Sequence, residues 1–145
     1  MIEIRPMQGS DLEFVMADPF QDSAKAYPVL SPDSMVRDSI TCVFEGEIVA
    51  VAGIIVYWPG VAEVWMMLTK KARKKGIFGL IAFNAIAKKI NDWIVDHKLR
   101  RVQAQVRSDF PKALKMIKTL GFKYEGTKKQ FSPDGADMQM FARII

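Results

Sequence analysis

The sequence predicts an α/β (α+β) protein in which a mostly antiparallel mixed sheet is flanked by helices. Short stretches that alternate polar and apolar residues, as half-exposed strands do, are interleaved with stretches whose apolar residues recur every three to four positions, as in helices. Three expected strands follow one another directly and two more close the chain, which favours antiparallel pairing. Gly and Pro separate most of these stretches.

The first half of the chain is expected to supply four strands and up to two short helices. MIEI predicts a strand that ends at Arg5-Pro6, and Ser10 resembles the N-cap of a helix over about residues 11–16. Residues 17–33 are rich in Pro, Asp and Ser, which predicts a loop and a candidate wall of a substrate site, followed by a short helix over residues 34–40. A hairpin of residues 40–45 and 48–57 turns at Gly46, and Pro59-Gly60 leads into the strand over residues 61–69.

The second half is expected to alternate helices and strands. The three-to-four spacing from Ile77 to Ile94 predicts a helix with a broad apolar face, and RVQAQVR at residues 101–107 predicts a half-exposed strand. Pro111 opens a second helix, which carries Leu114, Ile117 and Leu120 and stops before Gly121. Residues 122–131 and 138–144 predict a terminal hairpin with an Asp134-Gly135 turn.

Length and composition favour one compact domain over residues 1–145. The chain has 145 residues, half of them apolar, which is enough for one substantial core. Its longest apolar run, Ile48 to Trp58, is shorter than the ~20 residues that a membrane-spanning helix needs. The N-terminus lacks the apolar core of a signal peptide, and the single Cys42 fits a reducing compartment, so we expect a cytoplasmic protein with a buried, inert thiol. The lone His97 has no second His or Cys near it, so no metal site is expected.

A cluster of cations precedes the longest expected helix. The net charge of +5 includes Lys70, Lys71, Arg73, Lys74 and Lys75, which lead to Gly76. A helix start exposes unpaired N–H groups and a positive partial charge, so a basic glycine-containing loop at that place favours a phosphate or pyrophosphate. The alternative is a solvated basic loop in which Gly76 serves only as a turn residue.

The order of elements, together with LGFKYEG at Leu120 to Gly126, resembles the GNAT superfamily of N-acetyltransferases over essentially the whole chain. The resemblance implies the acyl-CoA N-acyltransferase fold, with acetyl-CoA as cosubstrate and the motif R/Q-x-x-G-x-G/A around its pyrophosphate. Phe78 stands where the family has Gly or Ala, with Gly79 one residue later. The cofactor-binding residues that the resemblance implies are Arg73, Lys74, Lys75, Gly76, Ile77, Phe78 and Gly79 in this loop, and Met66 and Leu68 in the strand before it.

The resemblance also implies a catalytic residue. Many members place a carboxylate on the fourth strand as general base, and Glu63 lies close to that place. Many carry a Tyr on the last helix as general acid, but Ile117 stands at that position and Tyr124 lies in the next strand. The alternative for Glu63 is a solvent-facing strand residue.

Three classes of function remain open. The first is an acyl-CoA-dependent N-acetyltransferase that transfers an acetyl group to an unspecified amine, as a monomer or homodimer without a membrane partner. The second is a non-catalytic GNAT-fold protein with a degenerate CoA site and an assembly or binding role in a phage or prophage, because the chain also resembles the short acetyltransferase-like proteins of tailed phages, which need not be enzymes. The third is a nucleic-acid-associated protein that uses the lysine-rich segments, although the aromatic interleaving of a dedicated binder is absent.

Overall fold

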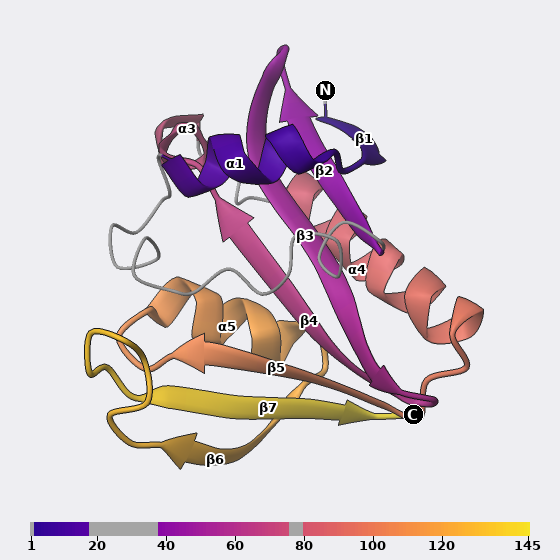
Figure 1. The fold of residues 1–145 in the computed structure, drawn as a ribbon, viewed down its shortest axis with the longest axis vertical. Coiled ribbons are helices and arrows are strands. Elements are labelled where there is room, and N and C mark those ends of the chain that lie inside the picture. Colours follow the sequence, from indigo (N-terminus) through magenta and orange to yellow (C-terminus); the bar gives the residue numbers. More distant parts are fainter. Residues whose placement is uncertain (1, 18–37, 76–79) are drawn as a thin grey trace. The chain divides into compact units, whose positions relative to one another are not determined.

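The computed structural model describes residues 2–17, 38–75 and 80–145 (Figure 1). The elements are β1 (Ile2–Pro6), α1 (Gly9–Ala17), β2 (Ser39–Phe44), β3 (Glu47–Trp58), β4 (Val61–Leu68), α3 (Lys70–Lys75), α4 (Leu80–Asp96), β5 (Arg101–Arg107), α5 (Pro111–Thr119), β6 (Lys123–Lys128) and β7 (Met138–Ile144). The expected substrate-side loop over residues 17–33 lies outside the described residues apart from Ala17, and so does most of the helix expected over residues 34–40.

The strands form a seven-stranded mixed sheet in the order β1-β2-β3-β4-β5-β7-β6. β1 with β2, β2 with β3, β5 with β7, and β6 with β7 run antiparallel, whereas β4 and β5 run parallel. The predicted fold class is confirmed. The chain divides into two compact units, Met1–Ile55 with Trp65–Lys89, and Val56–Val64 with Ile90–Ile145. A single domain over residues 1–145 stays a prediction.

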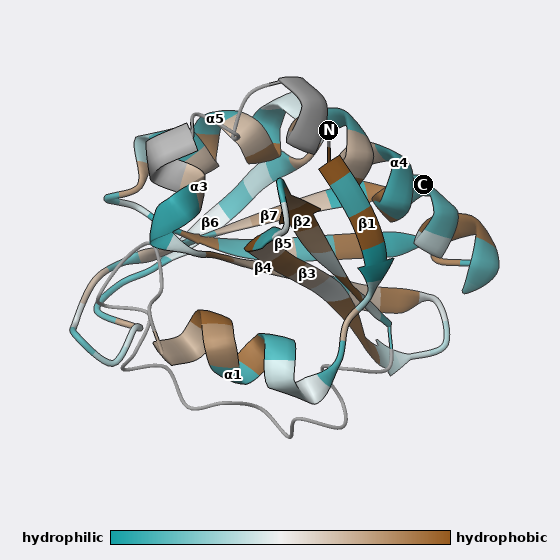
Figure 2. Ribbon diagram, turned by 90° about the horizontal axis from the view of Figure 1, so that it is seen from above, coloured by the Kyte–Doolittle hydropathy of each residue, from teal (hydrophilic) through white to brown (hydrophobic). Residues whose placement is uncertain are grey.

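The first unit packs α1 against one face of its strands. Met7, Leu12 and Val15 are buried with Val51 of β3, and Trp65 and Met67 of β4 pack beside them. The middle of β3 is buried and apolar, brown in Figure 2, as the long apolar run predicted. Cys42 is fully buried in β2, which raises the pKa of its thiol to about 11, so the prediction of a buried thiol is confirmed.

A buried carboxylate fixes the start of α1. Arg5 donates to both oxygens of Asp11 at 2.7 and 2.9 Å, and the Gln8 N–H and Thr41 hydroxyl donate at 2.8 and 2.9 Å. The hydrogen bonds from Arg5, reinforced by those from Gln8 and Thr41, lower the pKa of Asp11 to about 2 in spite of its burial. The helix begins at Gly9. The cap interaction is thus made by Asp11 reaching back to Gln8, and the predicted Ser10 cap is wrong.

The basic segment after β4 is helical from Lys70 to Lys75, and the predicted loop over these residues is wrong. Lys, Ala and Arg are strong helix formers, and Ala72, the one apolar residue, is buried and donates its N–H to the Thr69 carbonyl at 3.1 Å. Lys71 pairs with Glu47 of β3 at 2.7 Å. Local propensity together with one buried contact therefore gives α3 in place of an irregular turn.

In the second unit, α5 packs against β5. Val102 and Ala104 of β5 and Ile117 of α5 are buried. Gly121 has a φ of +89° and donates its N–H to the Lys118 carbonyl, while the Phe122 N–H reaches the Ile117 carbonyl, as in a Schellman motif. The predicted glycine stop of this helix is confirmed.

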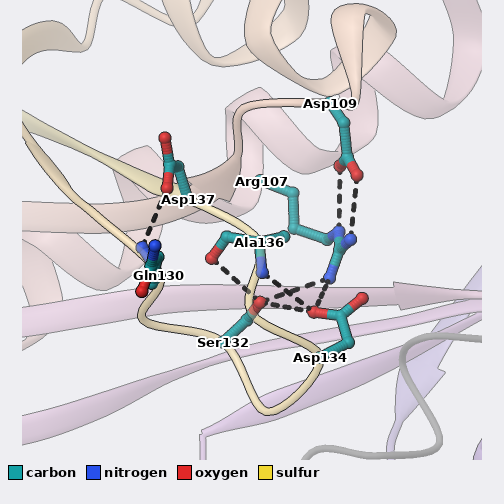
Figure 3. A network of polar contacts seen from close by, with 7 residues as sticks. All are labelled: Arg107, Asp109, Gln130, Ser132, Asp134, Ala136 and Asp137. Carbon is teal, nitrogen blue, oxygen red and sulfur yellow. Dashed lines mark hydrogen bonds and ion pairs between the residues drawn. The ribbon is translucent and has the colours of Figure 1, made fainter.

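The terminal hairpin has a longer connection than predicted, because β6 ends at Lys128 and β7 begins at Met138. Arg107, at the end of β5, contacts both Asp109 and this connection (Figure 3). Its Nη2 lies 2.9 Å from Asp109 Oδ2, and its Nη1 lies 2.9 Å from Asp134 Oδ1. The Asp134 carboxylate also accepts from the Ser132 hydroxyl at 2.6 Å. Arg107 holds the pKa of Asp109 and Asp134 below their usual range. The predicted turn at Pro133, Asp134 and Gly135 is present, with the Gly135 N–H donating to the Ser132 carbonyl at 2.8 Å, and the charged clamp of Arg107 holds it within the longer connection. Within the described ranges, no helix is long and apolar enough to cross a membrane.

Candidate active site

Glu63 lies where the pairing of β4 and β5 ends. The parallel register joins Val61 to Arg101, Ala62 to Val102 and Glu63 to Gln103, so Glu63 belongs to the last of these three pairs. Neighbouring residues of a parallel pair present their side chains to the same face. This placement brings Glu63 beside the alternate residues of β5 that point away from the buried Val102 and Ala104.

Two amides hold the Glu63 carboxylate. Gln103 Nε2 donates to Glu63 Oε1 at 3.0 Å. Gln105 Nε2 donates to Oε1 at 3.3 Å and to Oε2 at 3.4 Å. An ionised carboxylate offers about four acceptor positions, so these contacts orient Glu63 without occupying all of them.

Each amide is itself oriented by a cation. Arg101 Nε donates to the Gln103 oxygen at 3.1 Å, and Lys128 Nζ donates to the Gln105 oxygen at 3.4 Å. Because a cation donates to each amide oxygen, each Nε2 is left facing Glu63. Arg101 is also paired with Glu125 at 2.6 Å. Both cations thus act on Glu63 through an intervening amide, and no ion pair to Glu63 occurs among the residues that the structure describes.

Tyr57, near the end of β3, completes this group. Partial burial, then the neighbouring Glu63 carboxylate, raises the pKa of Tyr57 to about 12. The phenol is therefore protonated at neutral pH and can donate a hydrogen bond toward Glu63. We call Tyr57, Glu63, Gln103 and Gln105 the Glu63 cluster.

The residues that the sequence singled out fare differently. Glu63 lies in the cluster described above, and Met66 and Leu68 lie farther along β4, with Leu68 buried. The backbone of Arg73, Lys74 and Lys75 forms the end of α3. Gly76, Ile77, Phe78 and Gly79 lie outside the described residues. The catalytic role of Glu63 and the cofactor contacts of the others stay predictions.

The last helix offers no phenol. Ile117 is buried in α5, and Tyr124 is 56% exposed on β6, where its hydroxyl lies 2.7 Å from that of Thr127. Sequence reasoning missed Tyr57, Gln103 and Gln105. The signal for the glutamines was the alternation of RVQAQVR, which places them on one face. The signal for Tyr57 was its position two residues before the Pro59-Gly60 turn.

Comparisons with known proteins identify the fold. No protein-family model and no curated protein matches the sequence. Among solved structures, the chain is similar to Ard1 from Thermoplasma volcanium, with a TM-score of 0.77 and 18% identity over 99% of this chain and 97% of that one. It is also similar to a ribosomal-protein-alanine N-acetyltransferase from Brucella melitensis, with a TM-score of 0.71 and 17% identity over 99% of both chains.

A GNAT-family acetyltransferase from Bacillus anthracis is a third similar structure, with a TM-score of 0.71 and 18% identity over 99% of this chain and 94% of that one. The protein therefore has the fold of the GNAT acyl-CoA N-acyltransferases, as the sequence resemblance implied. The narrower resemblance to phage proteins receives no support from these comparisons.

Proposed function

We propose that this protein is an N-acetyltransferase that uses acetyl-CoA to acetylate an amine, with Glu63 as the general base. The observation that carries the proposal is the Glu63 carboxylate at the end of the β4–β5 pairing, held by two amides without an ion pair to a cation in the described part of the chain. A general base has to be fixed in position and still able to take a proton.

The chemistry asks little of the protein. A neutral amine nitrogen bonds to the acetyl carbonyl carbon and gives its proton to Glu63, and the carbon–sulfur bond breaks. The departing thiolate takes up one proton from the surrounding water to give CoA, and Glu63 returns its proton to water. Gln103 and Gln105 keep the carboxylate oriented while it accepts that proton. Tyr57, protonated at neutral pH, lies near the same carboxylate and can donate a hydrogen bond to it.

The basic helix α3 supports the use of a polyphosphate cosubstrate. Five of its six residues are Lys or Arg, and it contains no acidic residue. Cations at close spacing favour the phosphates of a CoA ester. Acetyl-CoA would supply the activated acetyl group, and Arg73, Lys74 and Lys75 are the residues we expect to hold its phosphates.

A coupled binding and activity measurement tests the proposal. Acetyl-CoA and CoA are expected to raise the melting temperature, because a ligand that binds only the folded state stabilises it by about 2.7 kcal/mol at roughly 100 times its Kd. Thiol release from acetyl-CoA should depend on added primary amines, and mass spectrometry should find the acetylated amine. If millimolar CoA leaves the melting temperature unchanged and no amine in a broad panel elicits thiol release, the protein is not an acetyltransferase.

A further inference from the structure

We propose that the acceptor is a primary amine whose far end carries an anionic group, bound in a pocket beside the Glu63 cluster with Arg100 as the anion contact. This inference rests on the proposed acetyltransferase function. The pocket has a volume of about 490 Å³, and its lining residues all belong to the second compact unit, at the end of β3, the starts of β4 and β5 and the end of β7. Small-molecule sites commonly enclose about 300–1,000 Å³.

The pocket continues from the Glu63 cluster, because the two share residues. Its lining includes Tyr57, Trp58, Val61, Arg100, Gln103 and Ile144. Gln103 donates to Glu63, and Tyr57 is the phenol beside that carboxylate. An amine held at Glu63 would therefore extend the rest of its molecule over Gln103 and Tyr57 into the pocket.

The walls of the pocket are apolar and exposed. Trp58, Tyr57 and Ile144 are 58%, 43% and 68% exposed, which is unusual for such large apolar side chains grouped together. Rings and a branched aliphatic side chain suit the hydrocarbon body of a ligand better than a highly hydrated one. The middle of the acceptor is thus expected to be apolar.

Two arginines line the pocket, and among the described residues one has a carboxylate partner and the other has none. Arg101 is paired with Glu125 through two hydrogen bonds at 2.6 and 3.0 Å. Arg100 donates to the Pro59 carbonyl at 3.2 Å, and no carboxylate of the described residues pairs with it. A guanidinium with unused donors in an apolar pocket favours a carboxylate or phosphate.

The turn of the β3–β4 hairpin holds this guanidinium in place. Gly60 has a φ of +90°, and a Cβ at that position would lie 2.5 Å from Arg100 Nη1. The glycine thus allows the guanidinium to lie directly on the turn while Pro59 accepts its hydrogen bond. Arg100 precedes Gln103 by three residues, which is on the order of 10 Å along an extended strand. The amine and the anionic group of the acceptor should have about that separation.

Three amines of equal chain length test the inference: ω-aminooctanoate, octylamine, and diaminooctane with both amines terminal. The wild-type protein is expected to show the highest kcat/KM for ω-aminooctanoate. In Arg100→Gln, the ratio of kcat/KM for ω-aminooctanoate to that for octylamine should fall about tenfold, the factor that corresponds to about 1.4 kcal/mol. In Arg100→Glu, diaminooctane, whose far end is a cation, should have a higher kcat/KM than ω-aminooctanoate, whose far end is an anion. Lys115→Gln, an exposed lysine of α5 with the same loss of charge, should leave the ratio at its wild-type value.

Binding without acetyl-CoA separates this inference from the proposed function. Titration of ω-aminooctanoate should change the fluorescence of Trp58, identified by comparison with Trp58→Phe, and Arg100→Gln should weaken that binding about tenfold. Acetylation of all three amines with one kcat/KM, unaltered in Arg100→Gln, would overturn the anion contact while the acetyltransferase function stood. Arg100-dependent binding without any acetyl transfer would support the pocket and remove the acetyltransferase function.

Discussion

Asp11 of α1 and Glu63 of β4 both accept several hydrogen bonds, yet the donors to the two carboxylates differ in charge. Asp11 is 4% exposed and receives two hydrogen bonds directly from the Arg5 guanidinium, with a backbone N–H and the Thr41 hydroxyl beside them. Glu63 receives hydrogen bonds from two neutral amides, whose oxygens in turn accept from Arg101 and Lys128. Each region has cations, but among the residues that the structure describes a cation contacts the carboxylate at Asp11 and not at Glu63.

This difference separates a structural carboxylate from one suited to chemistry. If Asp11 took a proton, it would give up an ion pair that fixes β1, α1 and β2 together. If Glu63 takes a proton, no ion pair with a described residue has to be broken, and the amides still hold the side chain. An amide that lies between a cation and the Glu63 carboxylate therefore orients the carboxylate without placing a positive charge in direct contact with it.

The largest expected effect is on catalysis. Glu63→Gln keeps the shape of the side chain and removes the proton acceptor, so kcat should fall by about 10²- to 10⁴-fold, the range typical of a lost general base. Steady-state kinetics with acetyl-CoA and a reactive amine measure this. The urea midpoint and the affinity for CoA should stay near wild type. A variant with wild-type kcat would show that another group or water accepts the proton.

Asp11→Asn should lower stability and leave catalysis unchanged. It removes the charge that Arg5 contacts and weakens four hydrogen bonds, so the free energy of unfolding should fall by about 2–3 kcal/mol, as expected for hydrogen bonds to a charged group. Urea denaturation gives that value, while kcat per folded molecule should remain unchanged. Loss of activity without loss of stability would contradict the structural role of Asp11.

Acid should remove the same contribution from the wild-type protein. The pKa of Asp11 is lowered from 3.8 to about 2 in the folded state. Its contribution to stability, about 2 kcal/mol, is thus present above about pH 4 and is lost as the pH falls through about 2. Asp109, Asp134 and Glu125, whose pKa values are also lowered, act in the same direction.

Comparing wild type with Asp11→Asn isolates the Asp11 contribution, since the other carboxylates are common to both proteins. The difference between their urea midpoints should shrink as the pH is lowered from about 5 to about 2. A difference that does not vary with pH would mean that Asp11 stabilises the fold by packing rather than by charge.

The smallest expected effect comes from making Glu63 resemble Asp11. Gln103→Lys places an ammonium where the amide now donates, and a direct cation favours the ionised carboxylate, so kcat should fall about tenfold. Gln103→Met is the matched control, because methionine has a similar length but neither a charge nor a hydrogen-bond donor. Its kcat should fall less than that of Gln103→Lys. Equal losses in the two variants would show that orientation, rather than charge, limits the rate.

The order of elements and most of their limits followed from the sequence, because they depend on local patterns. The hairpin turn at Gly46, the strand over residues 101–107 and the helix stop at Gly121 are each encoded by a few neighbouring residues. Lys70 to Lys75 was mistaken for a loop because charge density was weighed above helix propensity. The connection from β6 to β7 was expected to be short because nothing local shows that Arg107 clamps it.

The candidate site was predicted only in part for the same reason. Glu63 could be chosen from its place in one strand, together with a family resemblance. Its partners Gln103 and Gln105 depend on the parallel register with β5, which is set by residues forty positions away in the chain and carries no local signature. The Arg5 contact with Asp11 likewise spans two elements.

The glycine beneath the Arg100 guanidinium is constrained twice, by its own backbone angle and by the side chain that lies on it. A methyl group at position 60 would meet Arg100 at 2.5 Å, so a sequence that kept the arginine could not accept alanine there without moving it. Because a φ of +90° strains any residue that has a side chain, glycine should persist at position 60 in related proteins even where position 100 is no longer arginine. Position 100 can therefore vary while the turn stays the same, so acceptor preference could change by one substitution without remodelling the hairpin.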